Sequence, residues 1–270
     1  LTEEVQVIEL EANESVEVSL VEAAEACPVN AIRVIDAENN QDLVSVQLEL
    51  KQAKEITAQY DDATEYLAHY SKELIHYAEV LGRKIIHLEK PRLTKEEFQK
   101  VIEKLNPKLI LFNCHGDAST LYDEKINGEE QSLIVENENH ELLQNRLVYA
   151  RACSAGASLG IACTRKGDGC FIGYKRPFQF LIDETWATNP AKDNVAKTSL
   201  EPSNELAKCL IKGNPARDAV KRFMVVSGKN LSKLMTDMNK EEEGALAQMM
   251  ILWNNMQANV LLGNPNLSLS

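Results

Sequence analysis

The sequence has few residues that interrupt secondary structure, and it has no long apolar run. Only 12 of its 270 residues are glycine and 8 are proline, while 44% are hydrophobic and 26% are charged. This composition is typical of a globular protein and unlike that of a disordered or fibrous chain. The longest clean apolar runs, at 109–112 and 249–253, are far shorter than the roughly 18 residues that a membrane span needs. We therefore expect no membrane partner.

The sequence also lacks the cysteine patterns of disulfide frameworks and zinc sites. None of the six cysteines forms a Cys-x-x-Cys pair, and they show no paired spacing. Their pattern favours reduced thiols in the cytoplasm and argues against a bound metal or other cofactor. A secretory signal would begin with basic, then apolar, then small residues, and the chain has no such start.

Basic side chains are almost missing from the first fifty residues, where Arg33 stands against 12 Asp and Glu. This segment holds −11 of the net charge of −12, and we interpret the asymmetry as an organisational boundary. A net acidic chain without an evident basic stripe argues against nucleic acid as the main ligand. We expect the acidic segment to contact a basic surface, on a regulatory partner or at the active-site rim.

Within this segment, residues 21–34 read Val-Glu-Ala-Ala-Glu-Ala-Cys-Pro-Val-Asn-Ala-Ile-Arg-Val. Together with its flanks, over residues 5–35, this resembles the last helix and strand of a one-cluster ferredoxin, in which such a Cys-Pro supplies the fourth cluster ligand. A cluster needs four thiolates, and nothing before Cys27 supplies the other three. The ferredoxin-like module is therefore incomplete in this chain or vestigial, and residues 1–45 are expected to be a small docking or regulatory appendage.

From about residue 51 the signals of helices and strands alternate. The amphipathic residues 62–81, closed by Gly82, predict a helix, and Thr94 with Glu97 forms a capping box for the next one. Strands are predicted at 55–59, 84–88, 108–114, 146–153 and 170–174. The Asn-Gly pair at 127–128 predicts a hairpin with arms at 121–126 and 131–136. Further helices are predicted at 204–211, 216–238 and 241–260. Strands separated by helices imply an α/β fold, a parallel sheet with helices on both faces.

Two of the predicted strands end in reactive residues, and the carboxyl ends of strands are where chemistry collects in an open α/β sheet. One strand leads into Cys114, His115 and Gly116, and the other leads into Cys153. If these strands are neighbours, His115 and Cys153 emerge at the same edge, as an imidazole and a thiol must for acyl transfer. The backbone N–H groups of Gly116 and Cys153 are then candidate oxyanion donors. Strand alternation places Cys114 on the opposite face, in the core.

A strand followed by His-Gly, and then a strand followed by Cys-x-x-Gly, resembles the caspase-like (clan CD) cysteine peptidases, which include gingipains and CHAT-domain proteases. Residues 169–174 resemble the next strand of that family. The Leu-Leu-Gly-Asn-Pro at 261–265 resembles the Gly-Asp-Pro ending of gingipain and CHAT members, with Asn264 in place of Asp. The resemblance covers residues 52–270 and implies a caspase-like sheet, with His115 as general acid/base and Cys153 as nucleophile.

The same resemblance implies that the residue two before the nucleophile, Arg151, points into the S1 pocket. An arginine there favours an acidic P1 side chain, because it binds carboxylates in a bidentate manner. Asp61 and Asp62 argue the other way, since relatives with an acid in that region prefer basic P1 residues. A pair between Arg151 and Asp61 would neutralise the pocket, and Asp62 is equally well explained as a helix N-cap.

The leading hypothesis is therefore a cysteine endopeptidase that cleaves a protein substrate. The alternatives are an electron-transfer protein built on the ferredoxin-like start, and a catalytically inactive caspase-like interaction module.

Overall fold

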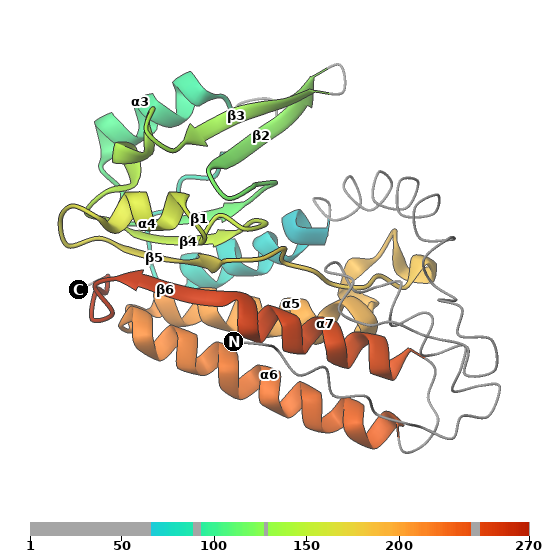
Figure 1. Cartoon of the computed structure of the whole chain (residues 1–270). Helices are drawn as coiled ribbons and strands as arrows, with labels where there is room; N and C mark the ends of the chain where they lie inside the picture. Colours follow the sequence, from blue (N-terminus) through green and yellow to red (C-terminus); the bar gives the residue numbers. More distant parts are fainter. Residues whose placement is uncertain (1–65, 89–92, 127–128, 239–243, 270) are drawn as a thin grey trace, which may run out of the picture.

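The computed structural model describes residues 66–88, 93–126, 129–238 and 244–269 (Figure 1). The ferredoxin-like segment, the strand predicted at 55–59, and the residues Asp61 and Asp62 lie outside this part of the chain. No helix in the described ranges is long and apolar enough to cross a membrane.

The centre of the fold is a four-stranded sheet in the order β1-β4-β5-β6. Its strands are β1 (Leu109–Asn113), β4 (Leu147–Arg151), β5 (Cys170–Tyr174) and β6 (Asn259–Gly263). The β1–β4 and β4–β5 pairs are parallel, and β6 runs antiparallel to β5. The predicted α/β class, with a mostly parallel sheet, is confirmed. The prediction of a helix through residue 260 is wrong at its end, because residues 259–263 pair with the open edge of β5 instead.

A hairpin of β2 (Thr120–Ile126) and β3 (Glu129–Val135) stands apart from this sheet, as predicted from the Asn-Gly pair. Helices cover both faces of the main sheet (Figure 1). The hairpin, α3 (Lys95–Leu105) and α4 (Leu159–Thr164) share one core cluster with the sheet. The opposite cluster contains the helix over residues 66–80, α5 (Asn194–Lys212) and α6 (Ala216–Met238). The last helix, α7 (Ala245–Ala258), packs along α6. Three short 3₁₀ helices lie in the connections, η1 (His140–Leu143), η2 (Glu184–Trp186) and η3 (Pro190–Lys192).

Local capping signals predict the helix boundaries well. The Thr94 hydroxyl accepts a hydrogen bond from the Glu97 N–H at 3.2 Å, so the predicted N-cap of α3 is confirmed. Gly82 follows the helix over 66–80 with a φ of 67°, the left-handed conformation in which glycine is favoured. The strand predicted at 84–88 is wrong, since these residues have no regular secondary structure. Ile85 and Leu88 pack against opposite core clusters without sheet pairing, while Ile86 is 40% exposed.

The prediction for α5 is too short, because the helix begins ten residues before 204 and continues through Pro202. A proline inside a helix leaves the carbonyl four residues earlier without its usual N–H donor. Here that carbonyl belongs to Thr198, and it accepts a hydrogen bond from the Asn230 side chain of α6 at 3.0 Å. The contact between helices therefore replaces the bond that proline removes.

Candidate functional site

The two strands that end in reactive residues are neighbours in the sheet. In the β1–β4 register, Asn113 lies opposite Arg151, and the Arg151 Nε donates a hydrogen bond to the Asn113 side-chain oxygen. His115 and Cys153 each follow this pair by two residues. Neighbouring strands lie about 4.8 Å apart, and residues two apart share a face. The register of the two strands therefore brings the residues that follow them, His115 and Cys153, to the same edge of the sheet.

Contacts between the two loops give the same arrangement. A Cβ atom built on Gly116 would lie 3.1 Å from the Ala152 Cβ and 3.2 Å from the Cys153 carbonyl oxygen. The loop that carries His115 therefore packs directly against the loop that carries Cys153, and any side chain at position 116 would crowd the contact.

The backbone of Gly116 is oriented by the base of the hairpin. Gly116 forms an isolated antiparallel bridge with Leu121, in which the Asp117 N–H donates to Thr120 and the Tyr122 N–H donates to His115, at 2.9 and 3.0 Å. In this type of bridge the two central residues do not bond to each other. The N–H of Gly116 consequently points away from the hairpin. That direction suits the predicted oxyanion donor.

Cys153 lies on a half-buried turn that is tied to the end of β5. Its thiol donates a long hydrogen bond of 3.9 Å to the Phe178 carbonyl oxygen. The next residue, Ser154, has a φ of 56°, an uncommon value for a residue with a side chain. Gly156 donates its N–H to the Tyr174 carbonyl at 2.9 Å, and a Cβ on Gly156 would lie 2.5 Å from a Val260 methyl group. The glycine three residues after the nucleophile position is therefore required by close packing on β5 and β6.

A segment that the sequence analysis did not single out passes beside this turn. Asn255 of α7, which is fully buried, accepts the Gln179 N–H at 3.0 Å and donates to the Gln179 carbonyl at 2.6 Å. The carbonyl of the preceding residue, Phe178, accepts the contact from the Cys153 thiol instead. No sequence signal marks Asn255, because it acts on a residue 76 positions away.

Arg151 is buried, with 1% of its surface exposed. Its Nη1 donates to the Asn204 side-chain oxygen at 2.7 Å and to the Ser203 hydroxyl at 3.3 Å, both on α5. Its Nη2 is buried without a hydrogen-bond partner among the described residues. All its hydrogen-bond partners are neutral oxygens, and burial lowers the pKa of the guanidinium. The predicted pair with Asp61 lies outside the described residues.

The remaining thiols are in different surroundings. Cys114 packs against the core cluster on the opposite face of the sheet, as predicted. Cys163 and Cys170 are buried, and desolvation raises the pKa of each to about 12, which makes them poor nucleophiles. None of the five described cysteines forms a disulfide. In the described ranges, no three His, Cys, Asp or Glu side chains are placed to hold a metal ion.

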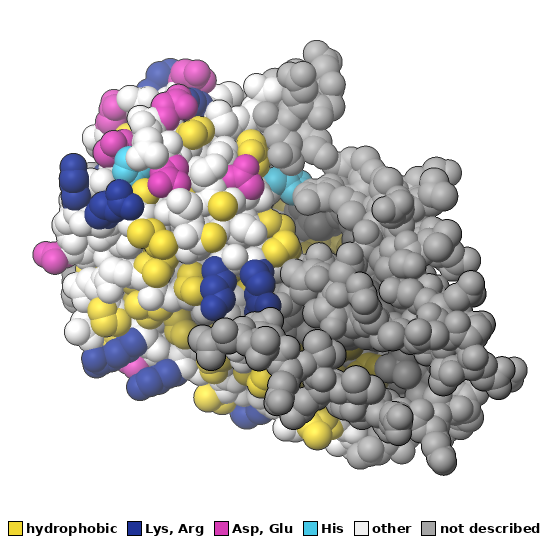
Figure 2. Space-filling view, in the orientation of Figure 1, with side chains coloured by type: hydrophobic (Ala, Val, Ile, Leu, Met, Phe, Trp, Pro, Cys, Tyr) yellow, Lys and Arg dark blue, Asp and Glu magenta, His cyan; other side chains and the backbone are white. Residues whose placement is uncertain are grey.

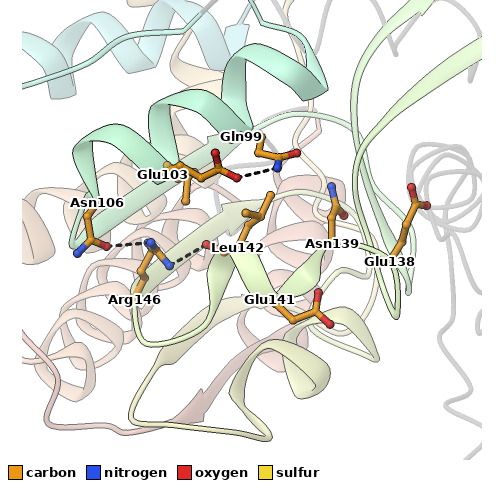
Figure 3. A pocket seen from close by; sticks show the side chains of 9 residues that line it. Gln99, Glu103, Asn106, Glu138, Asn139, Glu141, Leu142 and Arg146 are labelled. Carbon is orange, nitrogen blue, oxygen red and sulfur yellow. Dashed lines mark hydrogen bonds between the residues drawn. The ribbon is translucent and has the colours of Figure 1, made fainter.

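A groove of about 550 Å³ lies between α3 and the segment around η1 (Figure 3). Arg146 donates to the Asn106 side chain and to the Leu142 carbonyl, each at 2.9 Å, while Glu103 accepts a hydrogen bond from Gln99 at 2.7 Å. Neither His115 nor Cys153 lines this groove. It is separate from the site predicted from the sequence.

No protein-family model matches the chain, and the comparison with curated proteins gives no match. The resemblance to caspase-like peptidases therefore stays a prediction that rests on the motifs.

Proposed function

We propose that this protein is a caspase-like cysteine endopeptidase in which His115 and Cys153 cleave a peptide bond of another protein. The observation that carries the proposal is the register of β1 and β4. It pairs Asn113 with Arg151, and His115 and Cys153 each come two residues after this pair, which supports their meeting at the same edge of the sheet. The contact of Gly116 with the backbone of Cys153 supports the same arrangement.

In the proposed mechanism, His115 accepts the thiol proton of Cys153, and the sulfur attacks the carbonyl carbon of the scissile bond. The negative charge that develops on the carbonyl oxygen is stabilised by N–H donors, for which we propose Gly116 and Cys153. His115 then gives its proton to the leaving amine, so the peptide bond breaks and a thioester remains. Water, deprotonated by His115, hydrolyses the thioester and restores the thiol.

The segment over residues 178–180, beside Cys153, suits a peptide substrate. Asn255 occupies the backbone groups of Gln179, and the Phe178 carbonyl contacts the thiol. An extended peptide binds such an edge through main-chain hydrogen bonds. The backbone of Phe180 makes no hydrogen bond to another described residue.

Arg151 supports an acidic P1 preference within this proposal. It ends the strand that leads to Cys153, and its Nη2 has no hydrogen-bond partner among the described residues. A substrate carboxylate would supply that partner and would bind the guanidinium more strongly than neutral oxygens do. Since Arg151 is 1% exposed, the pocket must open for the side chain to enter, and we expect substrate binding to include this step.

The test combines thiol labelling with a cleavage profile of the full chain. Limited iodoacetamide at pH 8, followed by peptide mapping, should modify Cys153 and spare Cys163 and Cys170, whose pKa values are raised to about 12. A peptide library should show cleavage after Asp or Glu. Selection for Lys or Arg at P1 would contradict the role of Arg151 and leave the peptidase proposal standing.

Two outcomes would contradict the peptidase itself. Selective labelling of Cys153 without cleavage of any library or protein substrate would favour an inactive interaction module. Bound iron with visible absorption in the purified protein, together with absence of cleavage, would favour the electron-transfer alternative.

A further inference from the structure

One exposed ridge of α6 is basic. Counting every fourth residue from Arg217, this ridge carries Arg217, Lys221, Val225, Lys229 and Lys233, and all five are exposed. We call these five residues the α6 stripe. Residues four apart are neighbours on a helix surface, so the stripe is continuous in space. Three other residues separate each member of the stripe from the next in the sequence. The sequence analysis therefore found no basic stripe.

Within the described residues, the charges of the α6 stripe are poorly compensated. Arg217 and Lys221 share one carboxylate, that of Asp218, at 3.8 and 3.9 Å. Lys229 and Lys233 form no ion pair with a described residue. Like charges four residues apart on a helix also repel each other. Asp237 continues the same ridge four residues after Lys233, so Asp218 and Asp237 offset part of the four positive charges and leave the ridge with a net positive charge.

No other described helix has this charge. Helix α6 has five basic and two acidic side chains, a net charge of +3, whereas α3 is balanced and α7 has no charged residue. On the face seen in Figure 2, Asp and Glu gather over the upper part, where Figure 1 places α3 and the hairpin. Lys and Arg predominate over the lower part, where Figure 1 places α6. The positive charge of the α6 part attracts an anionic partner, and the negative charge of the part with α3 and the hairpin repels it.

We propose that the α6 stripe binds the acidic segment, residues 1–50, of the same chain. This segment has a net charge of −11 against the four positive charges of the stripe. It also contains many apolar residues, and Val225 on the stripe is a 53% exposed apolar side chain. The proposal concerns the exposed surface of α6 and does not depend on peptidase activity.

The connection between the two is short enough to favour binding within one chain. A network of ion pairs joins Glu73, on the helix that follows the segment, through Lys208 and Glu205 to Arg222 of α6. Residues 51–65 span up to about 50 Å when extended, and the 23 residues of α6 span about 35 Å. Tethering at this length gives an effective concentration in the millimolar range, so the chain's own segment outcompetes a dilute acidic partner.

The test is zero-length crosslinking of the full chain with a carbodiimide, which joins a lysine amine directly to a carboxylate. An equal mixture of nitrogen-15-labelled and unlabelled chains distinguishes links within a chain from links between chains. We expect Lys221, Lys229 and Lys233 to link to Asp and Glu of residues 1–50 in the same chain. These links should decrease as salt rises from 50 to 500 mM, because added salt screens exposed charges.

A charge-reversed variant and a matched control test the surface itself. In Lys229→Glu/Lys233→Glu, the links from Lys221 to residues 1–50 should fall by about fivefold, because two attractive contacts become repulsive. Lys100→Glu/Lys104→Glu reverses two exposed lysines at the same spacing on α3 and should leave these links unchanged.

Three results would overturn the proposal. The first is links from residues 1–50 that fall equally on Lys100 and Lys104. The second is links from the stripe that join only different chains. The third is binding of the full chain to phosphatidylserine vesicles that the Lys229→Glu/Lys233→Glu variant loses, with no link between the stripe and residues 1–50.

Discussion

The two faces of the sheet differ sharply at the carboxyl ends of β1 and β4. On one face, the half-buried Asn113 and the buried Arg151 form a polar contact, and His115 and Cys153 follow them in the chain. On the other face, the same strands present Phe112 and Ala150, which pack in an apolar cluster. One strand pair thus combines a face that carries polar side chains with a face that packs in an apolar core.

The helices that pack on the two faces of the sheet differ in the same way, one in polar and the other in apolar side chains. Helix α5 brings the buried polar residues Ser203 and Asn204 to Arg151. Helix α3 brings the buried Phe98 and Ile102 to the opposite cluster. The polar face retains a desolvated charge with an incompletely bonded guanidinium, which costs stability. That cost is typical of sites where function, rather than packing, determines the residue.

The largest expected difference between the faces is in activity. Cys153→Ala and His115→Ala should each lower peptide cleavage by about 10³-fold or more, because one removes the nucleophile and the other its proton acceptor. Cys114→Ala, on the packing face, should change the rate by less than about threefold. The measurement is the initial rate on a fluorogenic peptide, with circular dichroism as the control for folding. If Cys114→Ala were the inactivating change instead, the alternation argument would be wrong by one residue.

The next effect is on stability. Arg151→Met should lower the free energy of unfolding by roughly 2–4 kcal/mol, because the buried Asn204 and the half-buried Asn113 lose their charged partner. Val148→Ala, on the packing face of the same strand, should cost about 1–2 kcal/mol through a cavity. Urea titration measures both.

A double variant separates the two causes. Arg151→Met combined with Asn204→Leu should recover part of the loss, since removing both partners of a buried hydrogen bond is less costly than removing one. Fully additive losses would show that the polar network contributes nothing beyond packing.

The smallest effects concern single hydrogen bonds that stabilise the helices on each face of the sheet. Thr94→Ala removes the N-cap of α3, and Asn230→Ala leaves the Thr198 carbonyl of α5 without its donor. Each should cost about 1 kcal/mol in thermal unfolding. Ser232→Ala, two residues from Asn230, exposed and outside the α6 stripe, is the control and should be nearly neutral. A loss for Asn230→Ala no larger than that of the control would mean that Pro202 needs no compensation from α6.

These two residues also show what sequence can and cannot predict here. The capping box at Thr94 is local, within four residues, so its pattern predicts the start of α3. The bond from Asn230 to Thr198 crosses between helices, so the sequence predicted a helix that begins only at residue 204, after Pro202, whereas α5 begins at Asn194. Period and composition likewise predicted β1, β4 and β5, but not β6, whose partner lies more than eighty residues earlier.

The residues of the candidate site also fall into those that the sequence predicted and those that it did not. Strand order and alternation placed His115, Gly116 and Cys153 together, because a parallel sheet aligns the ends of its strands. The polar partners of Arg151 and the Asn255 clamp on Gln179 come from helices far away in the sequence. Nothing local marks such contacts, since they depend on how whole helices dock.

The late position of β6 has a consequence for how the protein folds. Cys170 pairs with Gly263 across the three helices α5 to α7, so closing this contact requires the ordering of a very long loop. Such closures are slow, whereas the contacts between successive helices are local and fast. We expect α5, α6 and α7 to associate first and deliver residues 259–263 to β5. The sheet edge is then the last part to assemble, and a brief opening of β6 exposes the strand that anchors the turn after Cys153.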